Sequence, residues 1–325
     1  MTKAIVIGAG RISLSHIPHI INHSKCKLIA IVEPNLMLRF IIRRLTGIKV
    51  VKSINNIDSS SYDSAFILTP PQTHFSIAFS LLRDSKHVFM EKPLTLNPIE
   101  SEKLLDMAIE RNVQFSVGYV FRFQPVYMKI KKLLDSKNYG NINSAEIHMR
   151  GNVVSEKTPK TWRNVGVGSG CLYDYGCHAI NLSLYLFGHP SEVVCLEKEE
   201  LFQNGVVDRF KSKFIQKGNS KFDTTISCDW ADNSVRKAGI TINIETTLGS
   251  IWTDGQLIKI SGEKNEEFSI KNLDTNVSYY LRGEEFQMQL DNFLQSILAN
   301  DLRYSCSRDA VVCDKIISQL HECKL

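Results

Sequence analysis

The stretch Leu172–Asn181, LYDYGCHAIN, places a carboxylate, a thiol, an imidazole and an amide within one short segment. Asp174 and His178 are four residues apart, a spacing that stacks two side chains on one face of a helix. Histidine titrates near neutral pH, so it suits proton transfer to or from an alcohol. His178 is therefore a candidate acid–base group, with Asp174 orienting its ring or hydrogen-bonding a substrate; the alternative is a polar interruption in a core helix, because a lone helical histidine is usually a structural residue.

The same segment contains residue types that bind zinc. On a helix Cys171, Asp174 and His178 can share one face, whereas Cys177 points away, and zinc sites usually need paired spacings and further ligands elsewhere. A second candidate is HIPHIINH, which has neither an H-E-x-x-H pattern nor an acidic partner; its histidines are His16, His19 and His23. We expect no metal at either place and interpret Cys177 as a small core residue.

A glycine turn near the N-terminus has the pattern of a dinucleotide-binding fingerprint. In IVIGAGRISLSH, Gly8-x-Gly10-x-x-Ser13 follows an apolar run and precedes a helical pattern. Gly8 permits the tight turn, and Gly10 lets the backbone approach a pyrophosphate at the helix N-terminus. Ser13 replaces the usual third Gly or Ala and is still small. This turn predicts nucleotide binding.

Glu33 ends the second apolar run, about 20 residues beyond the glycine turn, where an acidic residue accepts hydrogen bonds from the adenosine ribose. A carboxylate there repels a 2′-phosphate, so Glu33 favours NAD over NADP. An arginine that turned inward would favour NADP instead, and three arginines follow: Arg39, Arg43 and Arg44.

A lysine follows another buried run, in HVFMEKPLT. Lys92 precedes Pro93, which restricts Lys92 to extended geometry. Open α/β sheets bind ligands at the carboxyl ends of their strands, so an ammonium here can stabilise negative charge developing on a carbinol oxygen. The alternative is a solvated loop lysine, which is the usual fate of this residue type.

These residues need a parallel sheet to bring them to one edge. The first third of the chain alternates continuous apolar runs with amphipathic segments, which is typical of strands covered on both faces. The predicted strands are KAIVIGAG, KLIAIVEP, SAFILTPP, KHVFMEKP and VQFSVGYV. The predicted helices are Ser15–His23, Leu36–Leu45, His74–Arg83 and Pro98–Arg111. This rhythm predicts an α/β Rossmann domain with a doubly wound sheet over residues 1–119.

The second half of the chain has a different rhythm. A predicted helix at Pro125–Leu134 and the helix of the opening stretch come first; strand-like segments then follow closely from Glu192 to about Ile270. Such spacing predicts a largely antiparallel sheet. Two helical segments close the chain, GEEFQMQLDNFLQSIL and SRDAVVCDKIISQL. We predict an α+β domain over residues 120–325, with terminal helices that can pack back on the first domain.

The composition is that of an ordinary soluble protein, with 43% hydrophobic and 22% charged residues. The net charge of +5 is spread out and gives no nucleic-acid signature. The strand pattern begins within three residues of the N-terminus, which leaves no room for a signal peptide, and no run approaches the length of a membrane span. Eight cysteines without a C-x-x-C pair indicate reduced thiols. We expect a cytoplasmic protein without a nucleic-acid or membrane partner.

The order of these motifs resembles the Gfo/Idh/MocA oxidoreductase family, which includes glucose–fructose oxidoreductase and inositol dehydrogenase. The motifs span nearly the whole chain: GAGRIS, ILTPPQTHFSIA, HVFMEKPLT, VGYVFRFQP, SGCLYDYGCHAIN and EEFQMQLDNFLQSI. E-K-P and the D-x-x-x-H helix are the most specific of them. The resemblance implies a Rossmann domain, a C-terminal domain with an open antiparallel sheet, and assembly into a homodimer or homotetramer through that sheet.

The resemblance also implies roles for individual residues. The catalytic positions are Lys92, Asp174 and His178. The dinucleotide is contacted by Gly8, Gly10, Arg11, Ile12, Glu33, Thr69, Pro70, His74, Glu91 and Lys92. The substrate is bound or framed by Arg122, Trp162, Arg163 and Asn181. Asn181 stands where many relatives carry Asp, and Ser169 interrupts a glycine run, so these departures leave the identity of the substrate open.

Together these features predict an NAD-dependent oxidoreductase acting on a hydroxyl or keto carbon of a sugar, sugar derivative or nucleotide sugar. Two alternatives use the same fold. One is a glycosidase that oxidises its substrate transiently with tightly held NAD, and it would release reducing sugar without accumulating NADH. The other is a non-catalytic sensor of nucleotides or sugars, and it would be inert toward every polyol tested.

Overall fold

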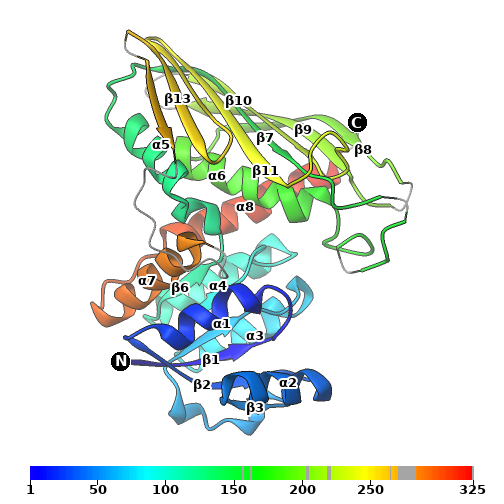
Figure 1. Ribbon diagram of the computed structural model, residues 1–325, viewed down its shortest axis with the longest axis vertical. Helices are drawn as coiled ribbons and strands as arrows, with labels where there is room; N and C mark the ends of the chain where they lie inside the picture. Colours follow the sequence, from blue (N-terminus) through cyan, green and yellow to red (C-terminus); the bar gives the residue numbers. More distant parts are fainter. Residues whose placement is uncertain are drawn as a thin grey trace. The chain divides into compact units, whose positions relative to one another are not determined.

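The computed structural model describes residues 1–155, 157–161, 163–202, 205–217, 221–263, 265–269 and 283–323. The chain divides into two compact units (Figure 1). Unit 1 comprises Met1–Val120 and Asn276–Val311, and unit 2 comprises Phe121–Thr275 and Val312–Leu325. The first boundary falls next to residue 119, and the first closing helix lies in unit 1 together with the start of the second.

Unit 1 is built on a 6-stranded sheet with the order β3-β2-β1-β4-β5-β6, in which every pairing is parallel. Its strands are β1 (Thr2–Ile7), β2 (Cys26–Val32), β3 (Lys49–Val51), β4 (Ser64–Ile67), β5 (His87–Met90) and β6 (Phe115–Val117). The order reverses between β1 and β4, which creates the crevice where such sheets bind dinucleotides. The predicted doubly wound sheet is confirmed, and the short edge strand β3 is an addition to it.

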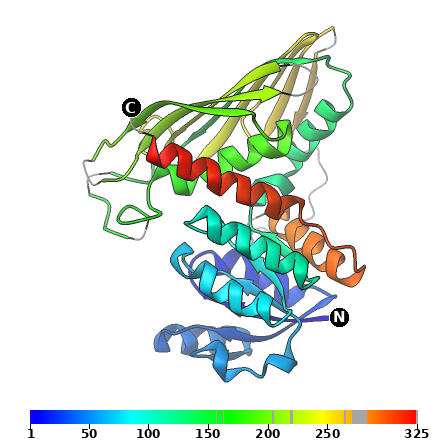
Figure 2. The same cartoon turned by 180° about the vertical axis from the view of Figure 1, so that it is seen from behind.

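Helices cover both faces of this sheet. They are α1 (Ser13–Asn22), α2 (Leu36–Thr46), α3 (His74–Arg83), α4 (Pro98–Glu110), α7 (Glu284–Leu298) and the start of α8 (Ser305–Glu322). Helix α7 packs beside α1, where the ring of Phe293 meets those of Phe66 and Phe89 at centroid distances of 5.4 and 5.9 Å. Helices α3 and α4 lie on the other face (Figure 2). A segment late in the sequence therefore completes the core of the first unit.

Unit 2 contains an 8-stranded sheet with the order β14-β13-β12-β11-β7-β10-β9-β8. Its strands are β7 (Ile142–Arg150), β8 (Glu192–Glu199), β9 (Arg209–Lys217), β10 (Lys221–Asp229), β11 (Gly239–Thr246), β12 (Gly249–Thr253), β13 (Leu257–Gly262) and β14 (Glu266–Ser269). Among the described strands of this sheet β7 and β10 form the one parallel pair, and the other pairs are antiparallel. The largely antiparallel sheet is thus confirmed, with a parallel join at its centre.

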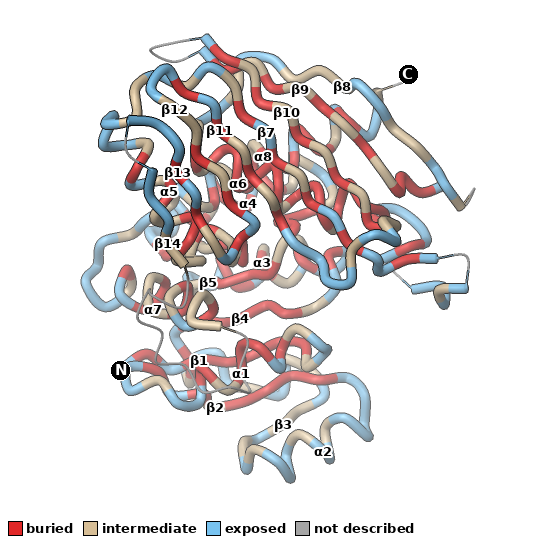
Figure 3. Tube along the Cα trace, turned by 45° about the horizontal axis from the view of Figure 1, so that its top comes forward, coloured by how far each residue is buried: buried red, intermediate tan, exposed pale blue. Residues whose placement is uncertain are grey.

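The two faces of the unit 2 sheet differ. Residues of β9 and β10 alternate between buried and half-buried positions, as expected for a sheet packed on one side (Figure 3). The buried face is covered by α5 (Pro125–Asp135), α6 (Cys177–Phe187) and the later part of α8. We call the opposite side the open face, because no helix of the described residues covers it.

Within the described part of the chain, no helix combines the length and the apolar character needed to cross a membrane.

Candidate active site

The glycine turn after β1 leaves space where a pyrophosphate can approach. Gly8 has a φ of +91°, and a Cβ there would lie 2.8 Å from the Cγ2 of Thr69, so a side chain would clash. A Cβ at Gly10 would meet no atom within 4 Å. Helix α1 then begins without a side-chain cap and without an acidic residue in its first turn. The N–H groups of Ser13, Leu14 and Ser15 donate to the carbonyl oxygens of Gly10, Arg11 and Ile12, so at this turn it is the positive end of the helix dipole that favours an anion.

Ser13 fits the turn despite its departure from the fingerprint. Its Oγ donates a hydrogen bond of 2.6 Å to the carbonyl oxygen of Gly10, and the residue is 1% exposed. The hydroxyl is satisfied within the turn, so a small polar residue serves here in place of Gly or Ala.

Glu33 lies at the end of β2, next to the glycine turn. Its Oε2 accepts a hydrogen bond from the backbone N–H of Ala9 at 3.1 Å, and its Oε1 accepts one from Asn35 at 2.8 Å. Arg39 turns toward the same strand end, but its guanidinium donates to the backbone oxygens of Glu33 and Pro34. The carboxylate therefore stands where the ribose of a dinucleotide is expected.

His74 supports the loops that follow β4 and β5. The side chain is fully buried; Nδ1 lies 2.9 Å from the carbonyl oxygen of Pro93, and Nε2 lies 2.9 Å from that of Thr69. Burial lowers the pKa of His74, and the carbonyls of Thr69, Pro93 and Leu94 and the charge of Glu91 only partly oppose it. Its contacts make His74 a brace between the two loops, while Thr69 and the exposed Pro70 remain accessible for the predicted dinucleotide contact.

Glu91 is held by a histidine whose partner the sequence did not reveal. His16 Nε2 lies 2.8 Å from Glu91 Oε1, and both side chains are nearly buried. The other carboxylate oxygen accepts a hydrogen bond from the backbone N–H of Lys92 at 3.3 Å. Gly118 gives the carboxylate room, because a Cβ there would lie 2.7 Å from Oε1. The expectation that His16 lacks an acidic partner is therefore wrong, since the partner is 75 residues away.

The neighbouring histidines do not gather around a metal position either. His23 Nε2 pairs with Asp291 Oδ1 of α7 at 2.7 Å. His19 is buried on α1. Among the described residues, no group of three or more His, Cys, Asp or Glu side chains is placed to hold a metal ion.

Asp174 and His178 emerge from an otherwise buried segment of unit 2. The chain forms a π-helical turn at Leu172–Gly176 and continues directly into α6. From 171 to 180 only these two side chains are half-exposed. The imidazole of His178 meets the ring of Phe121 edge-on, with centroids 4.8 Å apart. The sequence predicted an ordinary helix here, whereas π turns are rare and frequently occur at functional sites.

Arg163 comes from a loop to the same place. Its Nε lies 3.8 Å from Asp174 Oδ2. Both residues line a cavity of about 190 Å³ within unit 2, whose other described lining residues are Val153, Val154, Thr158, Thr161, Asn164 and Trp230. The structure therefore brings two of the predicted site residues together beside a small, partly polar hollow. Trp162, predicted to frame the site, lies outside the described residues.

Arg122 and Asn181 contact each other rather than a solvent-filled space. Arg122 Nε donates to Asn181 Oδ1 at 2.6 Å, and the guanidinium stacks over the ring of Tyr185 at 5.3 Å. The two residues are 8% and 1% exposed. Their contacts support the segment that carries His178, and direct substrate binding by either of them stays a prediction.

The cysteines of the opening stretch behave as core residues. Cys171 and Cys177 are fully buried, and the thiol of Cys177 donates to the carbonyl oxygen of Asp174. Burial raises the pKa of Cys171 well above its usual value, and the neighbouring Cys228 adds to this effect. A buried, protonated thiol is a poor metal ligand, which agrees with the interpretation of Cys177 as packing.

Two family models match this chain. One, described as an oxidoreductase family with an NAD-binding Rossmann fold, matches residues 2–119. The other, the GFO/IDH/MocA C-terminal domain, matches residues 127–252. The chain belongs to the Gfo/Idh/MocA oxidoreductase family. The predicted Rossmann domain, the NAD cofactor and the class of enzyme are thereby confirmed, and the open turn at Gly10 fits the cofactor.

Individual relatives agree with this assignment. An oxidoreductase of Formosa agariphila is 28% identical over 242 residues, covering 69% of this chain and 73% of the relative. A scyllo-inositol 2-dehydrogenase (NADP(+)) of Bacillus subtilis is 31% identical over 147 residues, covering 45% of this chain and 40% of that protein. A levoglucosan dehydrogenase solved with NADH and levoglucosan has a TM-score of 0.87 at 19% identity, covering 98% and 96% of the two chains. At that identity the last likeness establishes the fold alone.

Proposed function

We propose that this family member transfers hydride between NAD and a secondary alcohol or ketone of a cyclic polyol, sugar or sugar derivative. The observation that carries the proposal is the half-exposed pair Asp174 and His178: Asp174 lies on the π turn and lines a small cavity, and His178 follows at the start of α6. An NAD-dependent enzyme needs such an acid–base group, because the hydroxyl proton leaves when the hydride does. The name of the inositol dehydrogenase among the relatives supports the substrate class.

In this proposal each residue has a separate task. NAD, when bound, accepts or supplies the hydride. His178 Nε2 takes the hydroxyl proton during oxidation and returns it during reduction, and Asp174 orients the reacting hydroxyl. The ammonium of Lys92 stabilises negative charge on the carbinol oxygen. Glu91 fixes the backbone of Lys92 through its hydrogen bond, and His16 fixes Glu91.

The lining of the cavity supports a small polyol. Its volume of about 190 Å³ suits a single ring, and hydroxyl and amide groups lie on its wall at Thr158, Thr161 and Asn164. In the structure these groups hydrogen-bond one another and the neighbouring loop, which fixes the shape of the wall, and the indole of Trp230 supplies an apolar surface. Arg163, at the same wall, can bind a hydroxyl or an acidic substituent.

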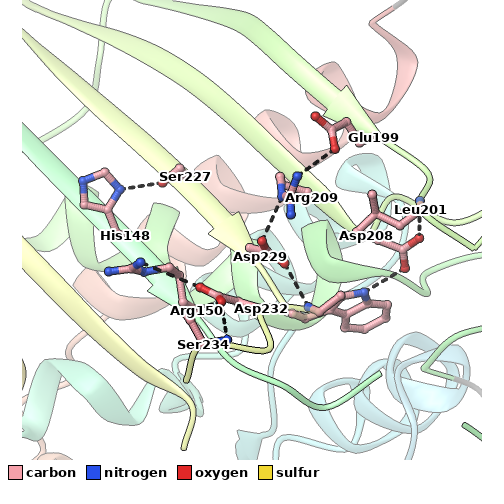
Figure 4. A network of polar contacts seen from close by, with 12 residues as sticks. His148, Arg150, Glu199, Leu201, Asp208, Arg209, Ser227, Asp229, Asp232 and Ser234 are labelled. Carbon is pink, nitrogen blue, oxygen red and sulfur yellow. Dashed lines mark hydrogen bonds and ion pairs between the residues drawn. The ribbon is translucent and has the colours of Figure 1, made fainter. Parts of the chain in front are cut away.

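The open face of unit 2 supports our proposal of a homodimer or homotetramer. It carries an ordered charge network in which Arg209 pairs with Asp229 at 2.8 Å and with Glu199 at 2.9 Å (Figure 4). Arg150 lies 3.7 Å from Asp232 in the same network. Side chains fixed in this way lose little further freedom when a second copy covers them. Native mass spectrometry of the wild type and of Arg209→Glu tests this, and a monomeric wild-type protein would contradict it.

The free thiols support a cytoplasmic location. All 8 cysteines are free. Four of them are buried in unit 2: Cys171, Cys177, Cys228 and Cys313. Thiols persist where glutathione keeps proteins reduced, and the same compartment supplies NAD.

The decisive experiment compares His178→Asn with His148→Asn. His148 is half-buried on the open face of the same unit and hydrogen-bonds Ser227, so it controls for the loss of an imidazole. Reduction of NAD is followed with a panel of inositols, anhydrosugars and nucleotide sugars, and NADH binding is measured separately. We expect kcat to fall about 10²–10⁴-fold in His178→Asn with NADH binding retained. His148→Asn keeps its turnover.

Lys92→Ala is the second variant, and we expect a comparable loss of turnover. Unchanged turnover in both His178→Asn and Lys92→Ala would overturn the proposal. Release of reducing sugar without net NADH would identify the glycosidase instead, and a wild-type protein inert toward the whole panel would favour the sensor.

A further inference from the structure

Unit 2 contains two pairs of neighbouring cysteines. Cys171 and Cys228 are buried, whereas Cys195 and Cys323 are both half-buried. In each pair the neighbouring thiol, through a hydrogen bond, helps to raise a pKa: that of Cys171 beside Cys228, and that of Cys195 beside Cys323. Cys195 is on β8, and Cys323 follows the last residue of α8. The two cysteines are far apart in the sequence and become neighbours only when the chain folds.

A β-bulge in β8 directs Cys195 toward α8. Cys195 pairs with Ser212 of β9 and Lys198 pairs with Phe210, while Leu196 is the extra residue that shifts the register. Side chains alternate along a strand, so without the bulge Cys195 and Lys198 would point to opposite faces. Their partners Ser212 and Phe210 are both buried. The bulge therefore places Cys195 and Lys198 together on the face that the helices cover.

The end of α8 is fastened to β8 at this position. Lys198 Nζ donates to the backbone oxygens of Leu320 and His321 at 3.3 and 2.9 Å. Gln319 Nε2 donates to the carbonyl oxygen of Val193 at 3.0 Å. A cation is favourable at the C-terminus of a helix, where unpaired carbonyls and the negative end of the dipole meet. These bonds hold the helix end, and the cysteine that follows it, against the strand.

We propose that Cys195 and Cys323 form a redox modification site, at which a disulfide oxidant such as oxidised glutathione closes a covalent link between β8 and the end of α8. One cysteine thiolate attacks a sulfur of the oxidant, forming a mixed disulfide and releasing one glutathione thiolate. The second cysteine thiolate attacks the protein sulfur of the mixed disulfide, forming the Cys195–Cys323 bond and releasing the second glutathione. The protein loses two thiol hydrogens, and oxidised glutathione is reduced to two thiols.

Accessibility separates this pair from the other one. Burial raises the pKa of Cys195, Cys323 adds to the effect, and the ammonium of Lys198 opposes it. Because the thiolate is the nucleophile, the exchange accelerates as the pH rises. The sulfurs of Cys171 and Cys228 are enclosed, at 0% and 1% exposure, so the same oxidant cannot reach them. The buried pair is thus an internal control.

The test uses the full chain incubated with oxidised glutathione and analysed by intact mass and by peptide mapping without reduction. We expect a loss of two hydrogen masses and one linked peptide joining Cys195 to Cys323. Dithiothreitol reverses both. The oxidised form has a higher midpoint of thermal unfolding than the reduced form, because the link closes a long loop.

Single substitutions distinguish this site from other thiol chemistry. Cys195→Ser and Cys323→Ser should each abolish the linked peptide, and each variant should instead gain the mass of one glutathione on its remaining thiol. Cys228→Ser should still lose two hydrogens. The proposal fails if the two-hydrogen loss persists in Cys195→Ser, if the linked peptide joins other cysteines, or if the wild type stops at the mixed disulfide.

Discussion

The two sheets of this protein are buried in different ways. In unit 1 consecutive residues of β4 are all buried, because helices cover both faces of the sheet. In unit 2 every second residue of β9 and β10 is half-exposed, because helices cover one face. A fully covered sheet presents chemistry only at the ends of its strands, where Gly8, Glu33 and Glu91 stand. A half-covered sheet leaves one broad face for contacts with another molecule and carries its candidate catalytic pair on a helix.

The largest expected effect is a loss of stability when adjacent residues of one strand are replaced by alanine, compared between β4 and β10. Phe66→Ala and Ile67→Ala, adjacent on β4 and 1% and 0% exposed, should each lower the free energy of unfolding by about 2–5 kcal/mol. On β10, Ile226→Ala should cost as much, but its neighbour Thr225→Ala should change stability by about 0.5 kcal/mol or less. Urea denaturation measures all four. The small effect is expected for the single chain, and a large loss in Thr225→Ala would mean that a second copy covers the open face at the concentration used, as in the proposed homo-oligomer.

A strand-end contact of unit 1 should be more costly to remove than a similar contact at its surface. His16→Ala leaves the carboxylate of Glu91 buried without its imidazole partner, so we expect a loss of about 1.5–3 kcal/mol and a lower kcat. His23→Ala is the matched control on the same helix. Its partner Asp291 keeps 39% of its side-chain surface exposed, so the loss should be about 1 kcal/mol or less. Equal losses of unfolding free energy in His16→Ala and His23→Ala would contradict the prediction that the buried contact with Glu91 is the more costly one to remove.

The next prediction compares the carboxylate of Glu33, at a strand end of unit 1, with that of Glu245, on the open face of unit 2. Glu33→Ala should weaken NADH binding about 10-fold, the equivalent of one charged hydrogen bond, and should reduce the preference for NADH over NADPH. Glu245→Ala, on the open face of unit 2, should leave both affinities unchanged. Fluorescence titration with each nucleotide measures the change. Unaltered nucleotide preference in Glu33→Ala would contradict the position assigned to the ribose.

The smallest expected effect is a pH dependence of stability from the brace at His74. Burial lowers the pKa of His74, so the native state favours the neutral ring and the unfolded state takes up a proton first. The stabilisation is therefore complete above the ordinary histidine pKa of about 6.5 and is lost as the pH falls below it toward the lowered native value. In His74→Asn the fall in unfolding free energy between pH 7 and pH 5 should be shallower than in the wild type. A steeper fall would contradict the assignment.

The strand-end residues were predictable from the sequence because each follows a local apolar run. Gly8, Glu33 and Lys92 needed only the rhythm of strands and turns to be placed at one edge of a sheet. The contact of His16 with Glu91 joins residues 75 apart, and that of Arg122 with Asn181 joins residues 59 apart. No local pattern encodes such pairs, because packing of separate elements creates them.

The same limit applies to backbone details of unit 2. Alternating residues predict strands, but they do not say that β10 pairs in parallel with β7. The bulge at Leu196 and the π turn before α6 each add one residue to a regular element, and the spacing of side chains alone does not reveal them. Short edge strands such as β3 and β14 also lack a run long enough to be recognised.

Helix α7 has a consequence for how the protein is made. The chain is synthesised from its N-terminus, so β4 and β5 leave the ribosome long before Phe293, which packs on Phe66 and Phe89. The strands of unit 2 that the structure describes, β7 to β14, are translated in between. During synthesis the rings of Phe66 and Phe89 therefore stay uncovered by α7 until the chain is almost complete. Chaperones can bind this apolar surface in that period.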